Sequence, residues 1–342
     1  AAASSPAAAK SWRLSASVVI LAPRGSVPGC DLSNPAGDDF DYRVCCVKRA
    51  AKSTFMPDTM VFPGGAVDPE DLASAAELAG SGGLDAAVRC AAVREAFEES
   101  GVAILDPPLA LGPAERAAWR DRVHGDAAQL RALCRDARVR PACGSLSFWC
   151  SFITPDVEHG RLPKGGFDTR FFVWCASGED AAWAAVDRHE TVSLAWLTPA
   201  EALAAVQARR IMMVPPQWFI LSELAECCPR MAGVAAYAAS PERSLQRDHP
   251  IKPYPVALGE EERERLLKQG GTVPTDSKQA AFALAMPGDE MHPVYPGGSG
   301  RRHRITVVGQ LGRLASFELQ RDGPFELPLR EATQGWYTLA KL

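Results

Sequence analysis

An acidic stripe on one predicted helix constrains this chain more than any other feature of its sequence. The apolar spacing predicts a helix from Asp85, its N-cap, to about Ser100. Glu95, Glu98 and Glu99 stand at i, i+3 and i+4 of that helix, so their carboxylates share one face. Like charges so close together repel, which leaves two interpretations open: a face that water solvates, or a site for a divalent cation. Converging hard oxygen ligands suit Mg²⁺ or Mn²⁺.

The composition excludes several classes of protein. Hydrophobic residues make up 47% of the 342 residues and charged residues 23%, which is typical of a globular chain of about two domains. The net charge of −4 lacks the basic surplus of a nucleic-acid-binding protein. The ten cysteines form no CxxC pair, which favours free, buried thiols over a zinc site or a disulfide framework. No apolar run reaches the length of a membrane span. We expect a protein that binds neither nucleic acid nor membrane.

The order of predicted elements indicates a mixed α/β fold. Strands are predicted at 15–21, 42–48, 60–62, 149–153, 169–175 and 192–197, and helices at 85–100, 114–124, 127–137, 200–208 and 216–228. Prolines become dense beyond about residue 243, where only two strands are predicted, at 304–309 and 314–319. The sequence therefore predicts a main domain at 11–242 and a less regular C-terminal extension at 243–342.

The acidic stripe belongs to a longer motif. The residues at 94–102 read R-E-A-F-E-E-S-G-V, and F-P-G-G stands before them at 62–65. This pattern resembles the Nudix box, G-x5-E-x7-R-E-U-x-E-E-x-G-U. Its second half is matched in register by Arg94, Glu95, Ala96, Glu98, Glu99, Gly101 and Val102. The resemblance implies the Nudix α/β/α sandwich, with a mixed sheet, helical insertions and a C-terminal extension.

The first half of the motif departs from the Nudix box. Gly65 and Arg94 are 29 positions apart, so about 15 residues are inserted. Asp71 stands where counting from Gly65 places the box glutamate, with Glu70 beside it, whereas counting back from Arg94 reaches Ala86. We expect the insertion, at about 72–84, to loop out before the catalytic helix. A second insertion is expected at 106–145.

Further stretches narrow the resemblance. Those at 149–173 and 189–203 resemble the strands and helix that complete the Nudix sheet. The chain ends in Ala340-Lys341-Leu342, which is similar to the Ser-Lys-Leu peroxisomal targeting signal, although a chance match is the alternative. Together with the box insertion, these features resemble the peroxisomal coenzyme A diphosphatases of the Nudix superfamily.

That resemblance implies a function, a location and a partner. The expected reaction is metal-dependent hydrolysis of coenzyme A and acyl-coenzyme A to adenosine 3′,5′-bisphosphate and (acyl-)4′-phosphopantetheine. The expected location is the peroxisome. The expected partner is a peroxisomal import receptor that binds the terminal tripeptide. One alternative is a Nudix hydrolase of ADP-ribose, NADH or a nucleotide sugar. Another is a Nudix-fold binding module without turnover, which a missing box glutamate would favour.

The resemblance also assigns roles to single residues. Glu98 and Glu99 would be primary ligands of Mg²⁺ or Mn²⁺, with Glu95 as a further ligand or the catalytic base. The Gly64 carbonyl would complete the ligand set, and Arg94 would orient a glutamate through charge-assisted hydrogen bonds. Glu190 stands where some relatives keep an extra carboxylate; a turn residue facing water is its alternative role.

A coenzyme A site needs cations for the 3′-phosphate of the substrate. The candidates before the box are Lys48, Arg49 and Lys52, and those after it are Arg161, Lys164 and Arg170. The alternative for each is an exposed charge that only improves solubility.

Overall fold

The structure is a computed structural model. It describes residues 11–30, 32, 38–51, 57–78, 82–156, 160, 165–187, 191–208, 210–243, 249–269, 280–310 and 313–321. None of the helices in these ranges is both long and apolar enough to cross a membrane.

A mixed seven-stranded sheet forms the centre of the molecule. Its strands are β1 (Arg13–Pro23), β2 (Tyr42–Arg49), β3 (Met60–Val61), β4 (Gly64–Ala66), β7 (Ser147–Ile153), β8 (Phe167–Cys175) and β9 (Thr191–Leu197). The main order is β3-β2-β1-β8-β7, with β4 paired to β1 and β9 paired to β2. β1 and β8 run parallel, and the other pairs are antiparallel.

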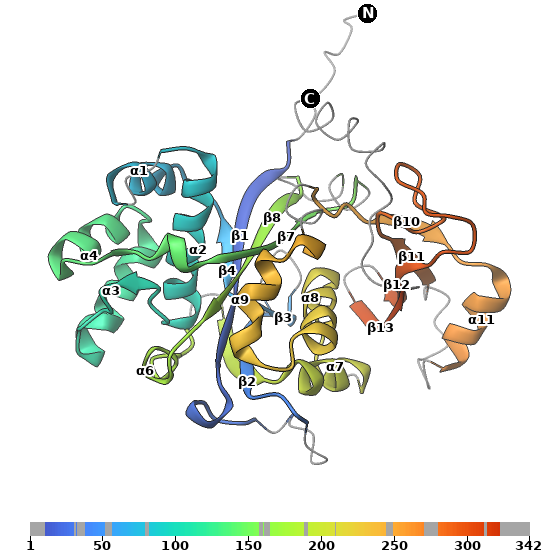
Figure 1. Ribbon diagram of the computed structural model, residues 1–342, viewed down its shortest axis with the longest axis horizontal. Coiled ribbons are helices and arrows are strands. Elements are labelled where there is room, and N and C mark those ends of the chain that lie inside the picture. Colours follow the sequence, from blue (N-terminus) through green and yellow to red (C-terminus); the bar gives the residue numbers. More distant parts are fainter. Residues whose placement is uncertain are drawn as a thin grey trace, which may run out of the picture.

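Helices cover both faces of this sheet (Figure 1). On one side lie α1 (Pro69–Leu78), α2 (Leu84–Ser100), α3 (Pro113–Gly125) and α4 (Gln129–Ala137), with the short α6 (Gly178–Ala181) near them. On the other side lie α7 (Pro199–Gln207), α8 (Pro215–Cys227) and α9 (Met231–Ala239). The predicted α/β/α sandwich with a mixed sheet is confirmed.

Burial on both faces explains why the strands read as continuous apolar runs. Successive side chains of a strand point to opposite faces. In β1, Val18 and Ile20 therefore belong to the core beneath α2, whereas Val19 and Leu21 belong to the core beneath α8. A strand covered on both faces needs apolar residues at every position.

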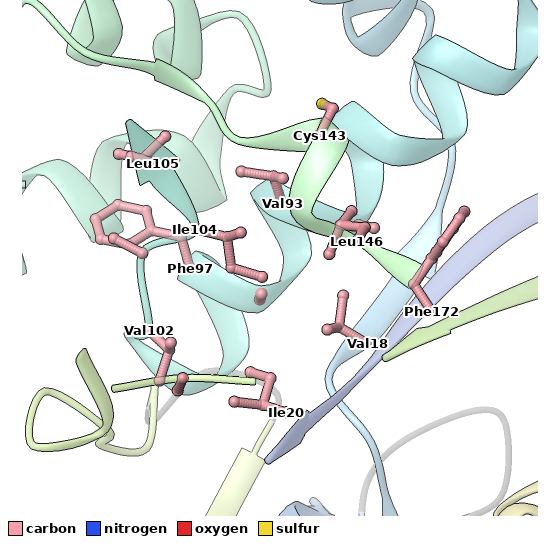
Figure 2. Close-up of a cluster of buried hydrophobic side chains, with 14 of the residues drawn as sticks. Val18, Ile20, Val93, Phe97, Val102, Ile104, Leu105, Cys143, Leu146 and Phe172 are labelled. Carbon is pink, nitrogen blue, oxygen red and sulfur yellow. The ribbon is translucent and has the colours of Figure 1, made fainter. Parts of the chain in front are cut away.

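The core beneath α2 fixes the helix that carries the acidic stripe. Val93 and Phe97 of α2 belong to the same buried cluster as Val18 and Ile20 of β1, and in Figure 2 the Phe97 ring lies beside Ile104 and Leu105. Ile104, which follows the helix, packs in the same cluster and is fully buried. Burying a side chain such as Phe97 contributes roughly 1.5–3 kcal/mol. This packing holds α2 against the sheet.

Two local predictions around α2 were wrong. The segment predicted to loop out at about 72–84 is mostly helical, because α1 continues to Leu78 and packs on α2. Asp85 is not the N-cap: α2 begins at Leu84, Gly83 takes the cap position without a side-chain cap, and Asp85 binds Arg89 at 2.8 Å. The second insertion contains α3 and α4, as predicted, and two short strands, β5 (Leu105–Asp106) and β6 (Arg140–Pro141).

The C-terminal extension is more regular than predicted. It forms a four-stranded antiparallel sheet of β10 (Tyr254–Ala257), β11 (Ala280–Ala285), β12 (His303–Gln310) and β13 (Arg313–Arg321), with α11 (Glu260–Gln269) beside it. The main chain of Ile251 attaches it to β7 through hydrogen bonds with Ser151 and Ile153. Buried Arg243 anchors its start, because its guanidinium binds Glu223 at 2.8 Å.

Candidate active site

The last two turns of α2 bring the three predicted glutamates to the edge of β4. Glu98 and Glu99 are only 6% and 4% exposed, and Glu95 is partly buried. Buried carboxylates of equal charge are costly unless cations or hydrogen bonds compensate them. The solvated acidic face is therefore excluded for Glu98 and Glu99.

The Gly64-Gly65 strand lies against these carboxylates. The Gly64 N–H donates to Glu99 Oε2 at 2.8 Å. A Cβ on Gly65 would lie 2.4 Å from Glu95 Oε1, and a Cβ on Gly64 would lie 2.4 Å from the carbonyl oxygen of Ala16. Gly64 is needed because the β1 backbone lies too close for any side chain, whereas a side chain on Gly65 would displace the Glu95 carboxylate.

Arg94 is the centre of the charge cluster. Its Nη1 donates to Glu95 Oε1 and to Glu98 Oε1, both at 2.8 Å. Its Nε and Nη2 form a fork on Asp71 at 2.9 Å each, and Nη2 also donates to the Ala66 carbonyl at 3.0 Å. Burial lowers the pKa of Arg94, but the nearby carboxylates outweigh this and raise it. The arrangement fits the orienting role that the resemblance implies.

Asp71, which counting from Gly65 puts at the box-glutamate position, is the carboxylate that holds the Arg94 guanidinium. It is fully buried, and both of its carboxylate oxygens bind Arg94. Its Oδ2 also accepts the Asp68 N–H at 2.8 Å, while Asp68 Oδ1 accepts the Glu70 N–H at 2.9 Å. This reciprocal capping starts α1, so the inserted residues follow Asp71 and leave its contact with Arg94 intact.

Glu95 is held in an environment that disfavours its charge. Burial raises the pKa of Glu95 to about 7, with Glu98 and Asp71 adding to the rise and Arg94 opposing it. A carboxylate in this position gains from a proton or from a metal ion.

The second insertion, at 106–145, adds two basic residues that were not predicted to belong to the site. Arg120 of α3 donates from Nε to the main-chain carbonyl of Glu98 at 2.7 Å. His124 Nδ1 lies 3.4 Å from Glu98 Oε2. These two residues are four positions apart on one helix face, but nothing in the sequence indicates that this face meets α2.

The carboxylates fit a divalent cation in their chemistry. Their oxygens are hard donors, and Glu98, Glu99 and Glu95 lie on one stripe beside the Gly64-Gly65 backbone. Among the described residues, no three His, Cys, Asp or Glu side chains are already arranged around a metal position. Arg94 lies between Glu95 and Glu98 and donates to Oε1 of each, so it fixes how both carboxylates are directed.

The structure does not bring together at this site all the Lys and Arg side chains that were predicted to bind the substrate. Arg49 pairs in the sheet with Thr191 of β9, the residue after Glu190. Lys48 is partly exposed, 3.5 Å from Asp58. Arg170 lies 3.5 Å from Asp85, ten residues before Glu95 on α2, a separation of roughly 15 Å along the helix. The predicted residues outside the described part are Lys52, Arg161, Lys164, Glu190, Ala340, Lys341 and Leu342.

Replacing Asp71 tests whether it is the box carboxylate. Asp71→Asn keeps the shape but removes the charge that the Arg94 fork binds. The free energy of unfolding should fall by about 3 kcal/mol, the low end for a broken buried pair, because Arg94 keeps Glu95 and Glu98. Glu70→Gln is the control, since the Glu70 side chain is 41% exposed and pairs with Arg131 rather than with Arg94. Equal urea midpoints for the two variants would show that Asp71 does not hold Arg94.

The raised pKa of Glu95 predicts a pH-dependent instability of the metal-free protein. The folded protein holds a proton there between about pH 4.5 and 7 that the unfolded chain has lost, so this group's contribution to stability falls as pH rises through that window. Glu95→Gln removes the titration. Relative to wild type, the variant should gain roughly 2–3 kcal/mol of unfolding free energy between pH 5 and pH 8 in chelator. A constant difference across this range would contradict the pKa assignment.

Comparison with known proteins agrees with this geometry. The family model described as the NUDT19 Nudix domain matches residues 12–80 and 78–224. The acyl-coenzyme A diphosphatase NUDT19 of Gallus gallus is 26% identical over 86% of this chain and 83% of its own length. The proteins of the same name from Xenopus laevis and Homo sapiens are 27% and 28% identical, over 64% and 63% of this chain and 71% and 68% of their own lengths.

A solved structure supports the fold. The crystal structure of a Nudix hydrolase from Alicyclobacillus acidocaldarius superposes with a TM-score of 0.53 at 23% identity, covering 67% of this chain and 97% of that chain. The family model covers more than half of the 342 residues, including both halves of the box around the insertion, and the chain therefore belongs to the Nudix hydrolases, in the group described as the NUDT19 Nudix domain.

Proposed function

We propose that this chain hydrolyses coenzyme A and acyl-coenzyme A at the diphosphate, giving adenosine 3′,5′-bisphosphate and (acyl-)4′-phosphopantetheine. The observation that carries the proposal is the complete charge cluster of a Nudix box, with Asp71 in the place of the glutamate, in a chain whose relatives are named acyl-coenzyme A diphosphatases. The intact Asp71–Arg94 contact also removes the reason to favour a binding module without turnover.

The residues divide the work of such a hydrolysis between them. A bound Mg²⁺ or Mn²⁺ supplies neutralisation of the diphosphate oxygens and a more acidic water. Glu98 and Glu99 would hold the ion with the Gly64 carbonyl, and Arg94 keeps Glu95 and Glu98 oriented through Nη1. Glu95 Oε1 accepts from Arg94, which leaves Oε2 to take the proton of the attacking water. A pKa near 7 suits a general base at neutral pH.

Glu99→Gln tests the site, and a substrate panel tests the reaction. Losing one ligand charge should lower turnover by orders of magnitude in saturating Mg²⁺ while the fold survives. Exposed Glu77 on α1 provides the control variant, Glu77→Gln, which should keep wild-type rates. The panel contains coenzyme A, acyl-coenzyme A, ADP-ribose, NADH and a nucleotide sugar, with products identified by mass spectrometry. Faster cleavage of any of the last three would replace the proposal with that alternative activity.

The 3′-phosphate of coenzyme A gives a sharper test of specificity. It carries nearly two negative charges and can form one to three charge-assisted hydrogen bonds, each typically about 1.5–3 kcal/mol. We expect kcat/KM for coenzyme A to exceed that for 3′-dephospho-coenzyme A by roughly tenfold to several hundredfold. Arg49→Ala should reduce that ratio because Arg49 lies next to the start of β9. Arg170→Ala, at the far end of α2, should leave the ratio unchanged. Equal kcat/KM for both substrates in the wild type would exclude a 3′-phosphate pocket.

We also propose that the protein is imported into peroxisomes through Ala340-Lys341-Leu342. The similarity of this tripeptide to a peroxisomal targeting signal supports the proposal. Deleting the three residues should move a fluorescently tagged protein to the cytosol and leave its activity in vitro unchanged. Continued peroxisomal import of the truncated protein would show that another segment carries the signal.

A further inference from the structure

The catalytic helix ends with an electrostatic problem that its own sequence does not solve. The C-terminus of a helix carries partial negative charge and several carbonyls without helical partners. Glu95, Glu98 and Glu99 add three carboxylates to the same two turns, and the last turn of α2 contains no basic residue. Arg94 of α2 binds Glu95 and Glu98 with its single positive charge, so any further compensation must come from another element.

Helix α3 supplies it from the insertion at 106–145. Arg116 donates from Nη1 to the Gly101 carbonyl at 3.4 Å and from Nη2 to the Leu109 carbonyl at 2.9 Å. One turn later, Arg120 donates from Nε to the Glu98 carbonyl at 2.7 Å. The guanidiniums thus reach the end of α2 at two points. Only Arg120 binds the main chain of a predicted metal ligand.

Arg120 makes a second contact that Arg116 lacks. Its Nη1 donates to the Val186 carbonyl at 3.1 Å, one residue before buried Asp187. Asp187 Oδ1 in turn accepts the Thr191 N–H at 2.9 Å, which fixes the start of β9. The carboxylates of Asp187 and Glu99 are both close enough to interact electrostatically with the guanidinium. One side chain therefore joins the last turn of α2 to Val186, beside the Asp187 that binds the start of β9.

We propose that Arg120 is a positioning residue of the metal site. Arg120 donates hydrogen bonds to the Glu98 carbonyl and to the Val186 carbonyl at the same time. It thereby fixes the last turn of α2 in the orientation from which Glu98 and Glu99 hold the divalent cation. The role depends on the fork of the guanidinium, since an ammonium cannot reproduce its planar, fixed donor geometry. The inference rests on the metal dependence in the proposed function and not on which substrate is cleaved.

The experiment measures Mn²⁺ binding by the purified full-length protein, from the electron paramagnetic resonance signal of free Mn²⁺, with no substrate present. Groups that orient metal ligands typically contribute 10–100-fold in metal affinity. Arg120→Ala should therefore weaken Mn²⁺ binding by about 10–100-fold, and millimolar guanidinium should restore part of it. Arg120→Lys keeps the positive charge and is used in case Arg120→Ala does not fold. It should also bind Mn²⁺ more weakly than the wild type, and added guanidinium should not restore its affinity.

Two arginines of the same helix are the controls. Arg116→Ala removes the neighbouring brace, which also stacks on Trp183 at 4.2 Å, so it should lower Tm without changing Mn²⁺ affinity at a temperature well below Tm. Arg122→Ala loses only a contact with the Trp119 ring and should change neither.

The outcomes separate this proposal from the proposed function. Wild-type affinity in Arg120→Ala and Arg120→Lys, or an equal loss in Arg116→Ala, would overturn it and leave α3 as a purely structural support. A wild type that binds no Mn²⁺ would overturn it as well. If Arg120→Ala binds Mn²⁺ weakly while the wild type cleaves no coenzyme A ester, the positioning role holds and the substrate assignment fails.

Discussion

The buried fork between Arg94 and Asp71 is the contact on which the site depends. Arg94 carries one positive charge, and three carboxylates bind it, so the cluster keeps an excess of negative charge even before Glu99 is counted. A buried ion cluster of this kind is weak evidence for stability, because desolvation offsets most of the attraction. Its value here is geometric. The guanidinium is planar and rigid, and it fixes the directions of Glu95 and Glu98 while β4 fixes Glu99.

The two insertions of this chain act on that cluster from opposite ends of the motif. Asp71 stands in the first turn of α1, so the inserted helix extends the element that holds Arg94 and does not interrupt it. α3 meets the end of α2 through Arg116 and Arg120. Lengthening surface connections costs little chain entropy, since each doubling of a loop adds only about 0.6 kcal/mol. Insertions such as those that contain α1 and α3 are therefore tolerated, and they can cover the partly charged end of a helix such as α2.

The predictable part of the site is local. The i, i+3, i+4 spacing and the helix span are properties of neighbouring residues, and the structure has both, whereas the glycine pair forms strand β4. The helical course of 72–78 was missed because Asp68 and Asp71 were not recognised as a capping pair. The C-terminal sheet was underestimated because dense prolines near 250–255 obscure the strands that follow them. Arg120 could not have been found at all, because its partners lie 22 and 66 positions away and only tertiary packing brings them together.

The burial of Glu95 destabilises the metal-free protein and also gives the site its chemistry. Removing water from Glu95 raises its pKa toward neutrality, which destabilises its charged form in the metal-free protein. A divalent cation binds best where negative charge is uncompensated and already desolvated, so the free energy that folding loses on this stripe becomes available when the ion arrives. The packing of Phe97 and Val93 beneath α2 makes this possible, since it holds the helix in place while Glu95 stays in an environment that disfavours its charge. Residues from other elements, such as Arg120, then orient the ligands before the ion binds. Less of that free energy is then lost in rearranging them.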